Sequence, residues 1–271
     1  MTVINTNVSA TLAANSLARN ERAMTTAMER LSTGKRINGA GDDAAGLAIA
    51  SSMSAQVKGL EQAARNVADG ISMVQTIESA GMEMMDILVR MKELAVQASS
   101  ETYQTSDLAA LDAEYQALEA EMTRIADDTE WNGSNPIKQA TTVTLQIGID
   151  STHTLDVEFI DLSPGGGATD VSGDLTTASN AQTEMSAVDT AIDNLAAELA
   201  KQGASLNRLE YAQDNLLSVA ANIDASRSRI EDADYADETS ELARTQIISQ
   251  AATAMLAQAN QAKQTVLALL Q

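Results

Sequence analysis

The segment LSTGKRINGAGDDAAGLAIA, Leu31 to Ala50, interrupts a chain that has long helical patterns on both sides. It contains the glycines Gly34, Gly39, Gly41 and Gly46, and the acids Asp42 and Asp43. Glycine adopts the left-handed conformation without strain, so we expect Gly34 to end the first helix. Either Asp42 or Asp43 is expected to cap the next helix, because a carboxylate accepts free N–H groups of a first turn. The segment therefore predicts a joint between two helices, formed by these six residues.

A phosphate-binding loop would be another use for such glycines. A GxGxxG motif that starts at Gly39 needs a glycine at position 44, where this chain has Ala44. A P-loop that runs from Gly41 to Gly46 needs a lysine next, where this chain has Leu47. Neither pattern follows a predicted strand. We therefore expect no nucleotide and no other cofactor at the joint.

Both ends of the chain carry apolar residues in heptad spacing, the pattern of helices that pair along their length. The N-terminal seam is Val3, Ala10, Leu17, Met24 and Leu31, with Ala13 and Ala27 between them. The C-terminal seam is Ile248, Ala252, Met255, Ala259, Ala262, Val266 and Leu269. The two seams most simply pair with each other. Because alanine buries little apolar area, we expect the ends to be poorly ordered in a monomer and to need further copies to cover them.

Helical spacing of apolar residues predicts three more helices, at 43–98, 105–128 and 185–230. Apolar and polar residues alternate at 143–149 and again at 155–159, which predicts a β-hairpin. The fold class expected is mainly α. It is an elongated antiparallel helical bundle or coiled coil, made from both chain ends, with a small β-hairpin region in the middle.

This pattern predicts three parts of the chain. Residues 1–41 with 231–271 would form a terminal coiled-coil domain. Residues 42–135 with 181–230 would form a rod-like helical domain. Residues 136–180 would form the hairpin and a loop rich in glycine.

Composition and charge exclude several functional classes. The chain has no cysteine, which removes disulfides and thiolate chemistry, and its aromatic content is only 2%. Its net charge is −21, with +3 in residues 1–41 and +2 in 242–271, so residues 42–241 carry −26. Such a middle repels nucleic acid and anionic lipid. No apolar run of membrane-spanning length and no signal-peptide pattern is present. We expect neither nucleic-acid binding nor a membrane.

Motifs for catalysis and metal binding are not found. The acidic run 231–238 resembles a calcium loop only in charge, because Asp237 and Ala243 occupy the positions that need glycine and glutamate. The single histidine, His153, lies in the predicted hairpin turn and cannot build a metal site or a triad without partners. We therefore expect no enzyme and no metal.

Several long segments carry a resemblance to a known family. "INTNVSATLAANSL" and "RLSTGKRINGAGDDAAGLAIA" resemble the start of bacterial flagellins. The segments at 90–100, 114–133 and 207–216, and the final segment that starts "SRIEDADYADETSELARTQIISQ", resemble the other hallmark blocks of that family. The resemblance covers nearly all of 1–135 and 183–271. The chain looks like a short flagellin without bulky outer domains.

The resemblance implies a structural subunit that polymerises into the bacterial flagellar filament. Flagellins are secreted unfolded through the flagellar type III apparatus and end in the extracellular filament. It also implies as partners further copies of the chain, the flagellar cap, hook-junction proteins and an export chaperone. The terminal domain would form the inner filament tube, and the joint would be the spoke that links inner and outer tubes.

Two alternatives remain open at this stage. A hook–filament junction protein of the same family shares the terminal helices, although the strength of the match around the joint favours the filament subunit. An exported effector or adhesin, with an acidic middle that binds a host ligand, would have ends that are stably ordered in the monomer.

The resemblance also implies a candidate epitope for Toll-like receptor 5, at Arg90, Leu94 and Glu114. The surrounding pattern departs from the receptor-activating flagellins at Val89, where a glutamine is usual, and at Lys92, where an arginine is usual. Lysine lacks the bidentate geometry of arginine. The terminal leucines resemble a tail that an intracellular inflammasome sensor recognises: Leu267, Leu269 and Leu270.

Overall fold

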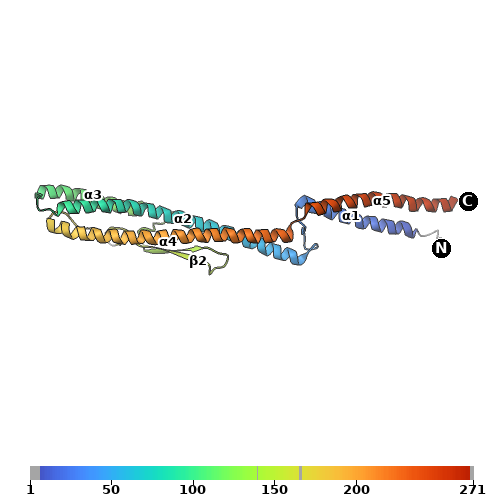
Figure 1. The fold of residues 1–271 in the computed structure, drawn as a ribbon, viewed down its shortest axis with the longest axis horizontal. Coiled ribbons are helices and arrows are strands. Elements are labelled where there is room, and N and C mark those ends of the chain that lie inside the picture. Colours follow the sequence, from blue (N-terminus) through green and yellow to red (C-terminus); the bar gives the residue numbers. More distant parts are fainter. Residues whose placement is uncertain (1–6, 139, 165–166, 269–271) are drawn as a thin grey trace. The chain divides into compact units, whose positions relative to one another are not determined.

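The computed structural model describes residues 7–138, 140–164 and 167–268, and for 262–268 it describes the backbone only (Figure 1). The elements are α1 (Val8–Thr33), α2 (Ala44–Ala98), α3 (Thr105–Asp128), β1 (Thr141–Gln146), β2 (Thr154–Phe159), α4 (Ala178–Glu231) and α5 (Tyr235–Ala268). The expected fold class, mainly α with a small β-hairpin, is confirmed.

The chain forms two compact units. The first comprises Met1–Val57 and Asn222–Gln271, and the second comprises Lys58–Ala221. This division differs from the three expected parts, because the first turns of α2 and the last turns of α4 group with the terminal helices. The three-part division stays a prediction.

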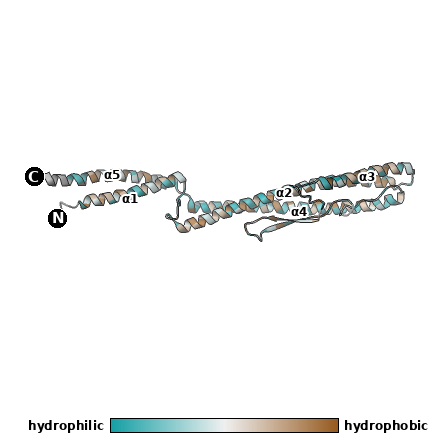
Figure 2. Ribbon diagram, turned by 180° about the vertical axis from the view of Figure 1, so that it is seen from behind, coloured by the Kyte–Doolittle hydropathy of each residue, from teal (hydrophilic) through white to brown (hydrophobic). Residues whose placement is uncertain are grey.

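In the first unit, α1 lies antiparallel beside α5, and hydrophobic residues are interspersed with hydrophilic ones along both helices (Figures 1 and 2). Most of the less exposed positions of α1 alternate in steps of three and four: Ala10, Ala13, Leu17, Asn20, Met24, Ala27 and Leu31. This face includes every described residue of the N-terminal seam. Only Asn20 and Ala27 are buried on it, so the helix pair itself covers little apolar area.

The face of α5 that is covered differs from the expected seam. From Leu242 onward, its less exposed positions are Leu242, Thr245, Ser249, Ala252, Leu256 and Ala259. Ala252 and Ala259 belong to the expected seam, whereas Ile248 is 39% exposed and Met255 is 65% exposed. Within one molecule α1 leaves Ile248 partly and Met255 largely uncovered, so the contacts expected for these two seam residues stay a prediction. The covered face of α5 combines Leu242 and Leu256 with small or polar residues, and Ile248 and Met255 fall outside it.

A buried polar contact joins the two terminal helices. The Asn20 amide donates a hydrogen bond of 2.7 Å to the carbonyl of Thr245, whose side chain is itself only 1% exposed. Further along, Asn7 donates to the carbonyl of Ala259 at 3.2 Å. A buried asparagine at a coiled-coil position specifies register at a cost in stability. These contacts therefore set the alignment of α1 with α5 without adding hydrophobic burial.

The second unit has a conventional apolar core. Side chains with 0–1% exposure come from all three of its helices: Val67, Val74, Ile77, Met84, Leu88, Met91 and Leu94 from α2, Met122 from α3, and Val188, Leu195 and Leu209 from α4. A Cβ on Gly81 would lie 2.9 Å from Leu199, so α4 approaches α2 closely at this point. Burial of large side chains at about 1.5–3 kcal/mol each makes this unit stable without partners.

The β-hairpin covers part of α2 in the second unit. β1 pairs with β2 in an antiparallel register that places Val143 opposite Val157 and Leu145 opposite Leu155. Leu155, Val157 and Phe159 are buried and alternate with exposed residues, as expected for strands with one covered face. Leu145 packs against Gly70 of α2, where no Cβ would fit.

A buried tyrosine ties the segment after the hairpin to α3 and α4. Tyr115 is 0% exposed, and its hydroxyl donates to the carboxylate of Glu184 at 3.0 Å and lies 3.3 Å from the carbonyl of Val171. Burial, reinforced by the charge of Glu184, raises the pKa of the Tyr115 phenol. The phenol therefore stays protonated and acts as a donor.

The carboxylate of Glu119 gives this unit a pH dependence. Burial raises its pKa, and the charges of Glu184 and Asp170 raise it further. The folded chain then binds a proton more tightly than the unfolded chain, so the free energy of unfolding falls as pH rises from the ordinary glutamate range through the raised pKa. Glu119→Gln should raise the thermal midpoint of this unit at neutral pH by about 2 °C, a small shift because solvent screens the site.

The control for this substitution is Glu121→Gln on the same helix. The pKa of Glu121 is lowered by its hydrogen bond from Arg124, so its charge is favourable and the midpoint should stay unchanged or fall. Circular dichroism melts at mildly acidic and neutral pH test both variants. Equal effects of the two substitutions at neutral pH would refute the assignment of the pH dependence to Glu119.

Candidate functional site: the terminal helix pair and the joint

The outer faces of the terminal helices carry large apolar side chains in contact with solvent. On α1 these are Val8 at 68% and Leu12 at 64% exposure, and on α5 they are Ile247 at 67% and Met255 at 65%. Scattered apolar residues are normal on a protein surface, but these lie on helices whose shared face buries mainly asparagine, threonine and alanine. Large apolar side chains such as Leu17, Met24 and Leu256 lie on the shared face, whereas these four stay uncovered by the partner helix. We call these four residues the outer apolar face.

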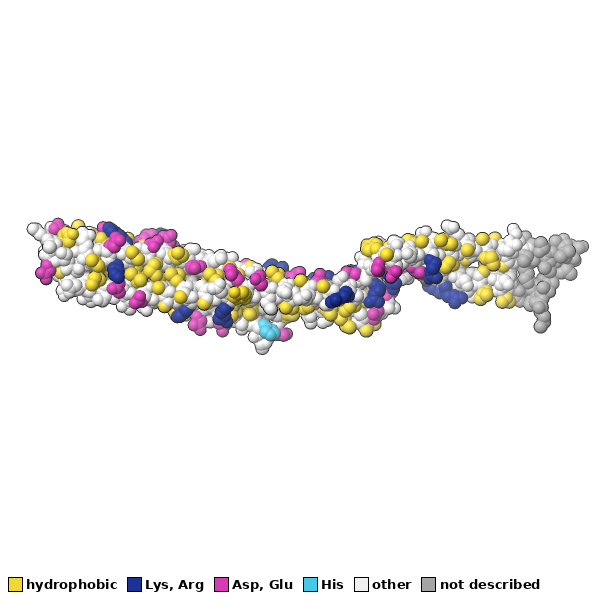
Figure 3. Space-filling model, in the orientation of Figure 1, with side chains coloured by type: hydrophobic (Ala, Val, Ile, Leu, Met, Phe, Trp, Pro, Cys, Tyr) yellow, Lys and Arg dark blue, Asp and Glu magenta, His cyan; other side chains and the backbone are white. Residues whose placement is uncertain are grey.

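The charge distribution on this pair matches its apolar character. In the space-filling view the acidic side chains spread over the second unit, and few lie on the visible side of the α1–α5 pair (Figure 3). From Leu242 to the end of the chain there is no aspartate or glutamate. An apolar face without like charges can be covered by another molecule at low electrostatic cost.

At the joint, a short antiparallel backbone contact ties the end of α1 to the segment between α4 and α5. Gly34 has φ +72°, and its N–H donates to the Arg30 carbonyl, which ends α1. The Gly34 carbonyl accepts a hydrogen bond from the Ala233 N–H at 3.0 Å, and the Arg36 N–H donates one to the backbone carbonyl of Glu231 at 2.6 Å. The backbones of Lys35 and Asp232 pair in an isolated antiparallel β-bridge, and the Lys35 ammonium lies 2.5 Å from the Glu231 carboxylate. The two chain segments are therefore held together where they leave the terminal helices.

The two adjacent acids of the joint have different roles. Asp43 Oδ1 accepts the Gly46 N–H at 2.9 Å, so Asp43 caps α2. Asp42 Oδ2 instead accepts the backbone N–H groups of Asn38 at 3.0 Å and Gly39 at 3.1 Å. Asp42 therefore holds the loop closed on itself.

The glycines of the joint also differ in what they contribute. A Cβ on Gly46 would lie 2.7 Å from Ile37 Cδ1, and Ile37 is only 2% exposed. Gly46 therefore allows Ile37 to pack against the first turn of α2. A Cβ on Gly39 or Gly41 would have no atom within 4 Å, and neither glycine has a positive φ. Within one molecule, only Gly34 and Gly46 require glycine.

We predict that Gly46→Ala loosens the joint. The added methyl must displace Ile37 or the Asp43 side chain, at a cost of about 1–3 kcal/mol for overpacking. Hydrogen exchange of residues 35–47 in the monomer should become faster. Gly41→Ala is the matched control, because its methyl enters open space and should change stability by less than about 0.5 kcal/mol. Equal exchange rates in the two variants would contradict the role assigned to Gly46.

The candidate receptor epitope is only partly at the surface. Arg90 donates to Glu114 Oε1 through two nitrogens, at 2.7 and 3.0 Å, and to Glu93 at 2.8 Å. These hydrogen bonds raise the pKa of Arg90, and the bond to Glu114 contributes most. Leu94 is 1% exposed and lies in the core of the second unit. The structure therefore brings Arg90 and Glu114 together as an exposed ion pair and places Leu94 beneath the surface.

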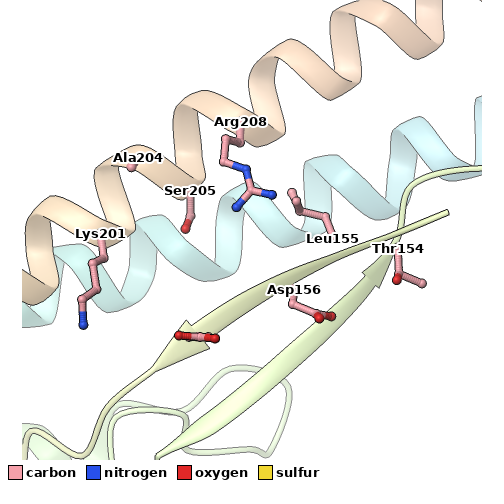
Figure 4. Close-up of a pocket in the computed structure, with 8 residues that line it drawn as sticks. Thr154, Leu155, Asp156, Lys201, Ala204, Ser205 and Arg208 are labelled. Carbon is pink, nitrogen blue, oxygen red and sulfur yellow. The ribbon is translucent and has the colours of Figure 1, made fainter. Parts of the chain in front are cut away.

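One groove of about 500 Å³ lies between β2 and α4 in the second unit (Figure 4). It is lined by Thr154, Leu155, Asp156, Glu158, Lys201, Ala204, Ser205 and Arg208. Lys201 and Arg208 extend from α4 toward the hairpin, which presents Asp156 (Figure 4). Its ionisable lining residues are two acids, Asp156 and Glu158, and two bases, Lys201 and Arg208.

Among residues 7–138, 140–164 and 167–268, no group of three or more histidine or acidic side chains is arranged to hold a metal ion. No helix in those ranges is both long and apolar enough to cross a membrane. His153 lies in the hairpin turn beside Asp150, at 3.6 Å.

Some of the expected site residues lie outside the described part: Val3, Leu269 and Leu270, and the side chains of Ala262, Val266 and Leu267. Other residues of the site were missed by the sequence patterns. Asn20 occupies a seam position between Leu17 and Met24, so a polar residue at heptad spacing was the available signal. Nothing in the sequence marked Ile37 as the residue packed against Gly46.

Comparisons with known proteins agree across the chain. The model of the bacterial flagellin N-terminal helical region matches residues 4–142, and that of the C-terminal helical region matches 185–270. A flagellin of Halalkalibacterium halodurans is 45% identical over 271 residues, covering 99% of each chain. The crystal structure of Bacillus cereus flagellin has a TM-score of 0.52 at 31% identity, covering 60% of this chain and 94% of that one.

A second solved structure resembles the fold alone. It is a putative flagellar hook-associated protein from Vibrio parahaemolyticus, with a TM-score of 0.61 at 10% identity, covering 70% of this chain and all of that one. At this identity the likeness gives no support to a hook–filament junction function.

Proposed function

The chain belongs to the bacterial flagellin family, and from this premise we propose how its surfaces build a filament. Members of this family are structural proteins, and this chain is a subunit of the extracellular flagellar filament that polymerises with copies of itself. What remains to be proposed is which residues make the contacts and which other proteins take part.

We propose that the outer apolar face of α1 and α5 is the principal polymerisation surface. The observation that carries this is the placement of Val8, Leu12, Ile247 and Met255 on the outside of a helix pair that buries small and polar residues inside. Each such side chain contributes about 1.5–3 kcal/mol when it is covered. A heterologous contact repeated along a helix sums these contributions over the whole polymer.

The seams of both terminal helices then have two roles. Ala10, Leu17, Met24 and Leu31 would align α1 with α5, while Ile248 and Met255 would contact neighbouring subunits. Because the pair covers little apolar area of its own, the terminal helices would gain most of their stability on assembly. This supports residues 1–41 with 231–271 as the inner tube of the filament.

The remaining parts follow from this assignment. Residues 42–135 with 181–230 would form the outer tube, and 136–180 would stand in place of larger outer domains. The joint, Gly34 to Gly46, would be the spoke between the tubes. Its support is the backbone contact at Lys35 and the packing of Ile37 on Gly46, which give the crossing chains a fixed geometry.

Further partners are proposed on the family resemblance. Export would use the flagellar type III apparatus, with a chaperone bound to the C-terminal helix beforehand. Growth would take place beneath the flagellar cap, on a base of hook-junction proteins.

The polymerisation proposal is tested by assembly from the purified chain. Heating to separate subunits, cooling, and adding short filament fragments as seeds should give rods that lengthen with time, seen by electron microscopy. A chain that stays monomeric with seeds at high concentration would contradict the proposal.

Activation of Toll-like receptor 5 would use Arg90 and Glu114 at the surface, with Leu94 supporting them from below. Arg90 would first have to leave its ion pair with Glu114, an exposed contact that solvent screens. A reporter-cell assay on the monomer should show a weaker signal for Arg90→Ala. Equal signals, or none from either protein, would reject this site.

A further inference from the structure

The sequence contains two Asn-Gly steps, Asn38–Gly39 and Asn132–Gly133. This dipeptide can lose ammonia without an enzyme. The glycine nitrogen attacks the asparagine side-chain carbon, and glycine favours the reaction because it has no side chain to obstruct ring closure. By local sequence the two steps should react alike. The structure places them in contrasting surroundings.

Asn132–Gly133 lies in an exposed tight turn between α3 and β1. Asn132 has φ +50° and Gly133 has φ +77°, and Trp131 and Ser134 on either side exchange backbone hydrogen bonds of 2.8 and 3.0 Å. Among the described residues, none makes a hydrogen bond with the Asn132 side chain or with the backbone nitrogen of Gly133. Space around Gly133 is also open, with nothing within 4 Å of a Cβ position. Both reacting groups are therefore free.

Asn38–Gly39 lies in the joint, and both of its reacting groups are held. The Gly39 nitrogen donates to the Asp42 carboxylate at 3.1 Å, and the Asn38 amide donates to the Lys35 carbonyl at 3.1 Å. Asp42 also accepts from the backbone nitrogen of Asn38 at 3.0 Å. Attack by the Gly39 nitrogen requires the loss of a hydrogen bond to a charged acceptor, which is stronger than one to a neutral acceptor.

We propose that Asn132 is a site of spontaneous deamidation in the folded protein, and that Asp42 protects the equivalent step at Asn38. At Asn132 the Gly133 nitrogen bonds to Cγ, the bond from Cγ to the side-chain nitrogen breaks, and the proton of the Gly133 amide leaves with that nitrogen as ammonia. Water then opens the five-membered succinimide at either carbonyl. The products are aspartate, or isoaspartate with one additional backbone carbon.

Isoaspartate formation at this turn has a structural consequence. The extra backbone carbon cannot be accommodated in a turn in which Trp131 and Ser134 exchange two hydrogen bonds. Asn135 follows directly, and its side chain donates to the last carbonyls of α3, those of Ala126 at 2.7 Å and Asp127 at 2.9 Å. Modification should therefore loosen the end of α3.

The experiment compares the two sites within one molecule. The full-length monomer is incubated at neutral pH, folded and in urea, and peptides that contain each site are followed by mass spectrometry for the exchange of NH for O. Isoaspartate is identified by isoaspartyl methyltransferase labelling. In the folded chain we expect about tenfold more reaction at Asn132 than at Asn38. In urea the two rates should be similar.

Two substitutions in the joint test the protective role. Asp42→Ala frees the Gly39 nitrogen and should accelerate reaction at Asn38 in the folded chain by about tenfold. Asp43→Ala is the matched control, because Asp43 binds Gly46 N–H instead and should leave Asn38 slow. Asn132→Gln, which would need a larger ring, should abolish the reaction at the turn.

Several results would overturn the proposal. Equal rates at both sites in the folded chain, or reaction at both only in urea, would show that the turn does not expose Asn132 to reaction. Equal acceleration by Asp42→Ala and Asp43→Ala would show that general loosening of the joint, not the Asp42 hydrogen bonds, governs Asn38.

Discussion

Deletion of residues 250–271 is expected to abolish filament growth while the second unit stays folded. The deletion removes Ala252, Leu256 and Ala259 from the face of α5 that contacts α1, and Met255 from the outer apolar face. The beginning of α1 then has no partner, since Asn7 loses its contact with Ala259. Loss of Met255 alone, at about 1.5–3 kcal/mol, already corresponds to more than about tenfold in subunit concentration, and loss of Leu256 further weakens the pairing of α5 with α1.

The second unit provides the internal control for this deletion. Lys58–Ala221 has its own buried residues on α2, α3 and α4, and the deleted segment belongs to the other unit. Its cooperative melt, followed by circular dichroism, should therefore be retained. Filaments of ordinary length from the truncated chain, seen by electron microscopy with seeds present, would defeat the proposed role of the C-terminal seam.

Helical periodicity allowed most of the fold to be predicted from the sequence. The helix expected at 105–128 coincides with α3, and those expected at 43–98 and 185–230 differ from α2 and α4 by no more than seven residues at any end. These helices bury large aliphatic residues on one stripe, so their spacing identifies the covered face. The hairpin was equally clear, because strict alternation gives only one face that can be buried.

The orientation of α5 could not be predicted in the same way. Between Leu242 and Ala259 apolar residues occur on most sides of the helix, and many are alanine. Several sets of residues spaced three and four apart therefore fit an apolar helix face equally well. The set that contains Ile248 and Met255 has the larger side chains. In the structure only Ala252 and Ala259, among the described residues of that set, lie on the inner side, where polar Thr245 and Asn20 meet, and Ile248 and Met255 are exposed. A hydrophobic pattern shows which residues are to be covered, not whether its own chain covers them.

The joint shows a related limit. Glycines and acids in one loop indicated a helix end and a cap, but the choice between Asp42 and Asp43 depends on a loop closed by two backbone hydrogen bonds. The packing of Ile37 on Gly46 is likewise a contact between residues without a shared periodicity. Sequence periodicity does not reveal such contacts, which become visible only in the three-dimensional structure.

The second large effect is expected from Ile247→Asp combined with Met255→Asp. Both side chains are about two-thirds exposed in the single molecule, so the monomer should keep its helix content and thermal midpoint. If neighbouring subunits cover these positions, each substitution loses about 1.5–3 kcal/mol of burial and also places a charge against an apolar surface. The concentration needed for seeded growth should then rise by at least about a hundredfold.

The matched control for this double variant is Gln246→Asp combined with Gln250→Asp. It adds the same two charges to exposed positions on the same helix, without the loss of a large apolar side chain. We expect it to assemble at close to the normal concentration, as measured by sedimentation of seeded filaments. If both double variants fail alike, added charge on α5 explains the loss. If both assemble normally, the outer face of α5 is not covered in the filament, and the polymerisation surface lies elsewhere on the molecule.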